Sequence, residues 1–232
     1  GYDPNAATRY PVVYLIAGEP GTSSDWFAGG QAAGLLDNLI ASGLVRPMIA
    51  VAPDVNGIGT SDTECLDSTR GGSQVETYLT TVLVPWVDSH LATAADREHR
   101  IIGGMSSGGF CAMDQGLRHQ DLYGTILGIM PFENPGAGGR AMLSSQAELA
   151  EHDIAAYLPT LPIVQPLHVF VDVPGKAVGL QEGIEAAHMV GLLRSRGVDV
   201  TFRAETGQGH TWRMARLALA PGLLLASQQL PA

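Results

Sequence analysis

Short apolar runs alternate along the chain with longer segments in which apolar residues recur at helical spacing. Each short run is rich in β-branched residues and is bounded by turn residues, as strands are. Each longer segment places apolar residues three and four positions apart, as helices with one buried face do. The pattern predicts strands at residues 10–18, 46–54, 100–105, 123–131, 167–173 and 198–205, and helices at residues 29–43, 73–91, 106–120, 181–197 and 210–220.

This alternation predicts an α/β fold with a mostly parallel central sheet and helices on both of its faces. The strands are apolar at nearly every position, which is typical of a sheet buried on both sides. No linker or change of composition interrupts the 232 residues, so we expect a single domain. Residues 132–166 are longer than a simple connection, and we expect them to hold one helix and a loop that forms a lid or pocket wall.

The charge of the chain excludes one class of partner. There are 23 acidic residues against 13 basic ones, which gives a net charge of -10. Nucleic acid is therefore not an expected partner, and the charge favours cationic over anionic substrates. The longest apolar run, at residues 217–226, is too short to span a bilayer and contains Pro-Gly. We expect the printed chain to be soluble and any membrane anchor to lie upstream of Gly1.

The segment "GMSSG" at residues 104–108 follows a predicted strand and precedes a predicted helix. It is a G-x-S-x-G sequence in the context of a nucleophile elbow, a sharp turn that exposes a serine hydroxyl. Ser106 stands between two small residues, whereas the position two before Ser107 is Met105. Ser106 is therefore the candidate nucleophile.

A serine hydroxyl is a poor nucleophile at neutral pH and needs an imidazole that accepts its proton. In hydrolases with such an elbow, an acid and then a histidine follow the serine along the chain. His119, His168 and His188 fall within predicted helices or a strand, and His152 lies in a segment without a clear pattern. His210 follows the last predicted strand in a glycine-flanked loop, so it is the candidate base.

Four segments together resemble the esterase D and antigen 85 branch of the α/β-hydrolases, also called the putative esterase family. They are residues 1–26, residues 75–91, the elbow at 104–109 and "GQGHTW" at 207–212. The branch includes feruloyl esterases, S-formylglutathione hydrolases and mycolyltransferases. The resemblance implies an α/β-hydrolase fold with edge strands upstream of Gly1. It also implies that a serine hydrolyses carboxylic esters through an acyl-enzyme, without a metal or organic cofactor.

The resemblance further implies an oxyanion hole made of two backbone amides. One amide belongs to Ser107, the residue after the nucleophile, and the other to Glu19 in the loop after the first strand. Relatives carry His-Gly or Asp-Gly where this chain has Ala17-Gly18. The difference leaves the amides in place but changes what supports them.

The sequence leaves the acid of the triad open. Relatives place Asp or Glu a few residues after the strand at 167–173, but residues 175–181 of this chain contain no carboxylate. Glu182 is the nearest downstream candidate and ranks first. Glu133, just beyond the preceding strand, ranks second, and Asp172, within the strand, ranks third.

The substrate is expected to be a small-molecule or lipid ester. We expect Trp26, Trp212 and Asp54 to contact it, because they lie in or near the loops that follow the predicted strands. Asp54, together with Asp62 and Glu64 in a polar loop at the same edge, is a candidate for binding a cationic group.

Cys65 and Cys111 match no metal-ligand spacing, and the sequence leaves open whether they form a disulfide or two buried thiols. A disulfide, together with the exported members of the branch, favours an extracytoplasmic or secreted location. Two alternatives to hydrolysis also stay open. One is acyl transfer to a sugar or lipid hydroxyl, and the other is non-catalytic binding in the cell envelope.

Overall fold

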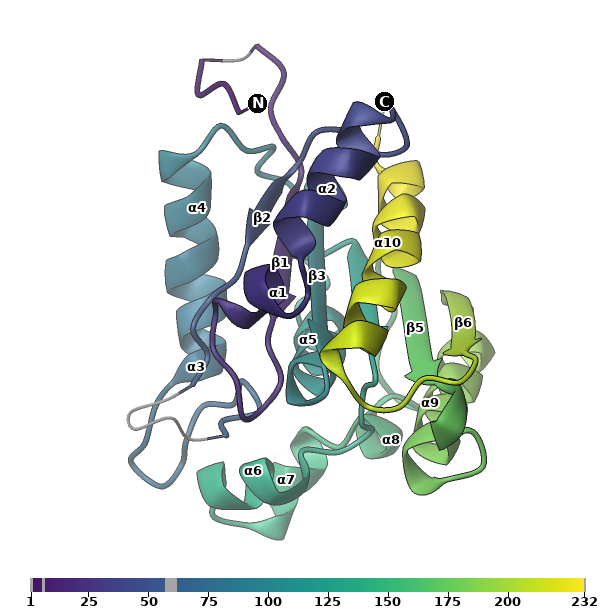
Figure 1. Ribbon diagram of the computed structural model, residues 1–232. Helices are drawn as coiled ribbons and strands as arrows, with labels where there is room; N and C mark the ends of the chain where they lie inside the picture. The colour runs from purple at the N-terminus through teal and green to yellow at the C-terminus, as the bar shows by residue number, and fades with distance from the viewer. Residues whose placement is uncertain (1, 6, 57–61, 232) are drawn as a thin grey trace.

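The central element of the fold is a six-stranded sheet in the order β2-β1-β3-β4-β5-β6. It comes from a computed structural model that describes residues 2–5, 7–56 and 62–231 (Figure 1). Every neighbouring pair of these strands is parallel, which confirms the predicted parallel sheet. The strands are β1 Val12–Ile16, β2 Ile49–Val51, β3 Arg100–Met105, β4 Thr125–Ile129, β5 His168–Pro174 and β6 Asp199–Glu205.

Helices cover both faces of the sheet and divide its core into two hydrophobic clusters. This arrangement explains why the strands are apolar at nearly every position, since side chains on both faces are buried. One face packs against α1 (Asp25–Ala28), α2 (Ala32–Ala41) and α10 (Trp212–Gln229) (Figure 1). The other packs against α3 (Val75–Thr77), η1 (Tyr78–Leu83), α4 (Val84–His90), α5 (Ser107–Arg118) and α9 (Gln181–Ser195).

Residues 132–166 form several short helices rather than the one helix expected, and they lie beyond the carboxyl ends of the strands (Figure 1). Local capping divides the segment. Ser145 and Glu148 form a capping box, and the Asp153 side chain accepts a hydrogen bond from the Ala156 amide, so each starts a new helix. The helices are α6 Gly136–Met142, α7 Gln146–Glu151 and α8 Ile154–Tyr157; the short turns η2 Arg97–His99 and η3 Gly175–Ala177 precede β3 and α9.

The last helix is longer than predicted, because α10 continues through Pro221 to Gln229. Proline removes one helical hydrogen bond, which normally favours ending the helix. Here Leu219, Leu223 and Ala226 are buried on both sides of the proline, and burying such side chains contributes about 1.5–3 kcal/mol for each leucine. Packing against the sheet therefore outweighs the local preference. Among the described residues, the structure contains no helix with the length and apolarity needed to cross a membrane.

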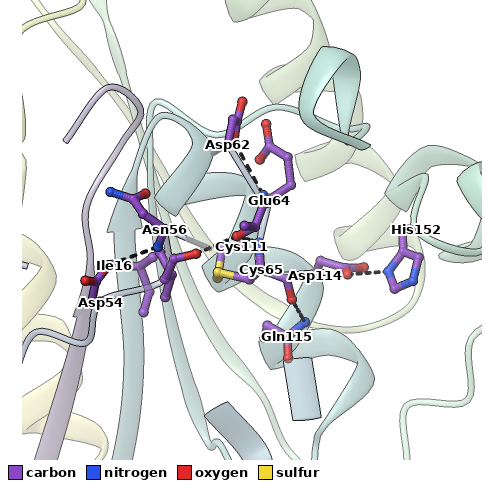
Figure 2. The surroundings of a disulfide bond; sticks show 12 residues. Ile16, Asp54, Asn56, Asp62, Glu64, Cys65, Cys111, Asp114, Gln115 and His152 are labelled. Atoms are coloured by element: carbon purple, nitrogen blue, oxygen red, sulfur yellow. Dashed lines mark hydrogen bonds and ion pairs between the residues drawn. A yellow bond between two sulfur atoms is a disulfide. The ribbon is translucent and has the colours of Figure 1, made fainter. Parts of the chain in front are cut away.

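A disulfide joins Cys65 to Cys111 and settles the question that the sequence left open. Figure 2 shows that it connects α5 to the loop that carries Asp62 and Glu64. Cys111 lies five positions after Ser106, so the bond ties this loop to the helix that begins at the elbow.

Removing the disulfide is expected to destabilise the fold without unfolding it. The bond closes a loop of 46 residues, and chain entropy predicts a loss of about 4 kcal/mol for a loop of that length. Urea denaturation of the double variant Cys65→Ala, Cys111→Ala measures this loss. Reductant should lower the midpoint of the wild type and leave the midpoint of the double variant unchanged. Equal stability of the double variant and the oxidised wild type would contradict the expectation.

Candidate active site

Ser106 lies at a sharp turn between β3 and α5, with φ 59° and ψ -123°. A non-glycine residue in this region costs about 1–3 kcal/mol of strain. The turn is held because the Ser106 amide donates to Ile129 O at 3.0 Å and the Phe110 amide donates to Ser106 O at 2.9 Å. A side chain at Gly104 or Gly108 would overlap neighbouring backbone atoms. The G-x-S-x-G sequence is thus required by close backbone packing around a partly exposed serine.

The loop after β1 lies directly against this serine. A Cβ atom at Gly18 would come within 2.9 Å of Ser106 Cβ and 3.0 Å of Met105 O. Glu19, the next residue, is therefore close to the elbow, and Ser107 begins α5. The first amides of a helix have no acceptor inside the helix and favour negative charge in front of them. The structure thus brings both predicted oxyanion residues to the side of Ser106.

His210 lies in the loop between β6 and α10, and its Nδ1 is 2.9 Å from Glu182 Oε1 in the first turn of α9. The two side chains are 36% and 22% exposed. The His210 ring is also parallel to the ring of Phe132, with centroids 6.3 Å apart. A carboxylate on Nδ1 orients an imidazole and leaves Nε2 available for proton transfer. Phe132 is a contact that the sequence did not predict.

Among the described residues, no hydrogen bond joins the Ser106 hydroxyl to His210. Hydrogen bonds between catalytic groups are often long before a substrate binds and tighten in the complex. A proton transfer from Ser106 to His210 would therefore use a hydrogen bond that forms in the substrate complex.

Among the described residues, neither of the other candidate acids is hydrogen-bonded to His210. Glu133 Oε2 is 2.8 Å from Nδ1 of His188 rather than near His210. Asp172 is fully buried in β5, and both of its carboxylate oxygens lack a hydrogen-bond partner. Its nearest ion-pair partner is Arg203, at 3.9 Å. The geometry therefore favours the first-ranked acid, Glu182, which is the candidate that contacts the candidate base.

Burial raises the pKa of Asp172 to about 7, although the charge of Arg203 opposes the shift. An unfolded chain releases this proton near pH 4. Between about pH 4 and 7 the folded state thus holds a proton that the unfolded state has lost, so this group lowers the free energy of unfolding as pH rises.

Asp172→Asn is therefore expected to be more stable than the wild type at pH 8, by on the order of 4 kcal/mol, and nearly equal to it at pH 4. Urea denaturation at the two pH values measures the difference. Asp199→Asn is a matched control, since the Asp199 side chain is 67% exposed. A difference that does not depend on pH would contradict the ionisation of Asp172 as its cause.

Each of the remaining candidate histidines has an acidic partner away from His210. In each of these pairs the acid is a residue other than Glu182. The nitrogen–oxygen distances are 2.8 Å for His119–Glu76, 2.8 Å for His152–Asp114, 3.2 Å for His168–Asp199 and 2.8 Å for His188–Glu133.

The prediction that Trp26 contacts the substrate is wrong. Its side chain is fully buried, and its indole nitrogen donates to Ile16 O at 2.8 Å. Its ring packs edge-on against Trp212, with centroids 5.2 Å apart. Trp26 therefore supports the loop after β1 from inside the core. Trp212 is half-buried, and the exposed Asp54 accepts a hydrogen bond from the Asn56 amide at 3.1 Å.

Asp62 and Glu64 lie beside Ser107 around a cavity of about 10 Å³, which has room for roughly one water molecule. Figure 2 shows the two side chains next to each other, above the disulfide. Burial, with the nearby charge of Asp62, raises the pKa of Glu64 to about 9. Glu64 is thus uncharged at neutral pH. Within the described ranges, no group of three or more His, Cys, Asp or Glu residues is arranged to hold a metal ion.

Comparisons with known proteins place the chain in a family. The sequence model of the family described as "Putative esterase" matches residues 1–185, which include Ser106 and Glu182 but not His210. An uncharacterized protein of Corynebacterium glutamicum is 27% identical over 228 residues, which cover 94% of this chain and 53% of that protein. The endo-1,4-beta-xylanase/feruloyl esterase of Xylanibacter ruminicola is 31% identical over 123 residues, or 50% of this chain and 16% of that enzyme. The chain thus spans about half the length of the first relative and less of the second.

Two solved structures share the fold over nearly the whole chain. A ferulic acid esterase is 24% identical, with a TM-score of 0.82 over 97% of this chain and 88% of that one. MPT51 of Mycobacterium tuberculosis is 18% identical, with a TM-score of 0.75 over 96% of this chain and 91% of that one. The sheet order, the parallel strands and these likenesses identify the fold as that of the α/β-hydrolases, as the sequence predicted.

Proposed function

Because the chain belongs to the putative esterase family, we propose that it hydrolyses carboxylic esters with Ser106 as the nucleophile. The observation that carries this proposal is the backbone of Ser106, which is held at φ 59° at the head of α5. Backbone strain of this kind costs stability and clusters at active sites, where the surrounding structure holds it in place. The His210–Glu182 pair at 2.9 Å supplies a base with its orienting acid, and it supports the same conclusion.

In the proposed reaction, Ser106 Oγ attacks the carbonyl carbon of the ester while Nε2 of His210 accepts the hydroxyl proton. The tetrahedral intermediate collapses when His210 gives this proton to the oxygen of the leaving alcohol, and an acyl-enzyme forms. His210 then takes a proton from water, which attacks the acyl carbon. The second collapse releases the carboxylic acid and returns the proton to Ser106.

Glu182 acts on Nδ1 of His210, where its carboxylate favours the tautomer that leaves Nε2 free to accept a proton. The backbone amides of Ser107 and Glu19 bind the oxyanion. Loss of one such donor typically costs about 3 kcal/mol of transition-state stabilisation, so the loop after β1 contributes to rate as well as to shape. The mechanism uses no metal or organic cofactor.

The proposed substrate is a small-molecule or lipid ester. The net charge of -10 favours neutral or cationic esters over anionic ones. We also propose that the protein works outside the cytoplasm. The Cys65–Cys111 disulfide supports this location, because disulfides persist in oxidising compartments and are rare in the cytosol.

The experiment that tests the function is hydrolysis of p-nitrophenyl esters from acetyl to long acyl chains. Methyl ferulate is added because a curated relative is named a feruloyl esterase. Turnover of at least one ester by the folded wild type, at a rate well above that of the spontaneous reaction, is expected. A folded protein that is inert toward every ester would overturn the proposal.

A further inference from the structure

Two histidine–glutamate pairs meet on helix α9. Helix α9 supplies Glu182 to one pair and His188 to the other. The segment after β4 supplies Glu133, and its neighbour Phe132 stacks on His210. The candidate base is thus held by α9 directly through Glu182, and indirectly through Phe132.

The Glu133 residue is fixed at both its side chain and its backbone. Its Oε2 atom is 2.8 Å from Nδ1 of His188, and its carbonyl oxygen accepts a hydrogen bond from the Ile154 amide at 2.8 Å. The Glu133 side chain is 18% exposed and the His188 side chain 54% exposed, so solvent reaches the pair mainly from the His188 side. Phe132, one position earlier and packed against the core, has little freedom to move while both contacts are made.

The single contact with Glu182 does not by itself fix the orientation of the His210 ring. The contact at Nδ1 fixes the position of that nitrogen, but the ring can still tilt about it. The Phe132 ring lies parallel to the imidazole within 9°, with the centroids 6.3 Å apart, so a large tilt of the imidazole toward Phe132 brings the two rings into contact. The direction of Nε2, which must reach Ser106, therefore depends on where Phe132 is held.

We propose that His188 and Glu133 are positioning residues, which fix Phe132 so that His210 presents Nε2 to Ser106. This inference rests on the proposed function. Neither residue touches the reacting atoms. An exposed ion pair adds only about 0–1 kcal/mol to stability, so a purely structural role would leave little trace in activity. A misplacement of about 1 Å near reacting groups, by contrast, can lower the rate by up to roughly 100-fold.

The kinetic test compares His188→Ala and Glu133→Ala with His188→Gln and with a control. The two alanine variants are expected to lower kcat roughly tenfold and to leave KM unchanged, since ground-state binding does not use His210. His188→Gln retains a donor for Glu133 and should recover most of the loss. His168→Ala removes a similar pair, 3.2 Å from Asp199 at the opposite end of the strands, and should behave as the wild type.

A second measurement reads the orientation of His210 without any activity. In spectra of histidine-labelled protein, His210→Gln assigns the ring signals of His210, which the Phe132 ring shifts. Phe132→Leu, His188→Ala and Glu133→Ala should all move these signals in the same direction, and His168→Ala should not. Unmoved His210 signals, or a wild-type kcat in both alanine variants, would overturn the inference while leaving the hydrolase proposal intact. An inert wild type would instead overturn the proposed function, and the spectra would still test the inference.

Discussion

Replacing Ser106 with alanine is expected to lower kcat by about 10⁶-fold, as removal of the nucleophile does in serine proteases. The variant keeps the backbone turn and its two backbone hydrogen bonds, so its urea midpoint should equal that of the wild type. Hydrolysis of the best p-nitrophenyl ester, followed over hours at high enzyme concentration, measures the residual rate.

Ser107→Ala is the matched control for this change. Ser107 is equally near the site, but the proposed mechanism uses its backbone amide and not its hydroxyl. Its activity should therefore stay within a few-fold of the wild type. An active Ser106→Ala, or a Ser107→Ala that is as inactive as Ser106→Ala, would contradict the assignment of the nucleophile.

Replacing Glu182 with glutamine is expected to lower kcat by about 10⁴-fold with little change in KM. The glutamine keeps the size of the side chain, but its amide can donate to Nδ1 of His210 and then favours the wrong tautomer. The pair is 2.9 Å apart and partly exposed, so the loss of stability should be small compared with the loss of rate.

Glu133→Gln is the matched control on the competing acid. Glu133 contacts His188 rather than His210, so the expected loss is at most about tenfold. Measuring both variants on the same ester ranks the two glutamates directly. A larger loss for Glu133→Gln than for Glu182→Gln would reverse the assignment made from the geometry.

Local signals explain how much of this fold was predictable. Strands such as β3 and β4 are apolar at almost every position and bounded by turn residues, so their place in a parallel sheet follows from pattern alone. The elbow is equally local, since Gly104 and Gly108 are needed by backbone contacts that any such strand-to-helix turn makes. Chain order and a glycine-flanked loop make His210 the candidate base in the sequence.

Features that depend on distant contacts were not predictable to the same degree. Glu182 ranked first among the acids only by its proximity in sequence, and its contact with His210 bridges 28 positions. Nothing near Trp26 signals that its indole nitrogen would bind Ile16 O inside the core. The extension of α10 beyond Pro221 likewise depends on packing against the sheet, which the local sequence does not encode.

The most direct test of the central claim, that Ser106 is an activated nucleophile, is labelling with a fluorophosphonate followed by mass spectrometry. After the Cys65–Cys111 disulfide is reduced, trypsin releases both serines in one peptide, residues 101–118, and fragmentation of that peptide locates the adduct. The account predicts one adduct per chain on Ser106, none in Ser106→Ala, and slow labelling in His210→Ala. An adduct on Ser107, or no adduct on the folded wild-type protein, would contradict it.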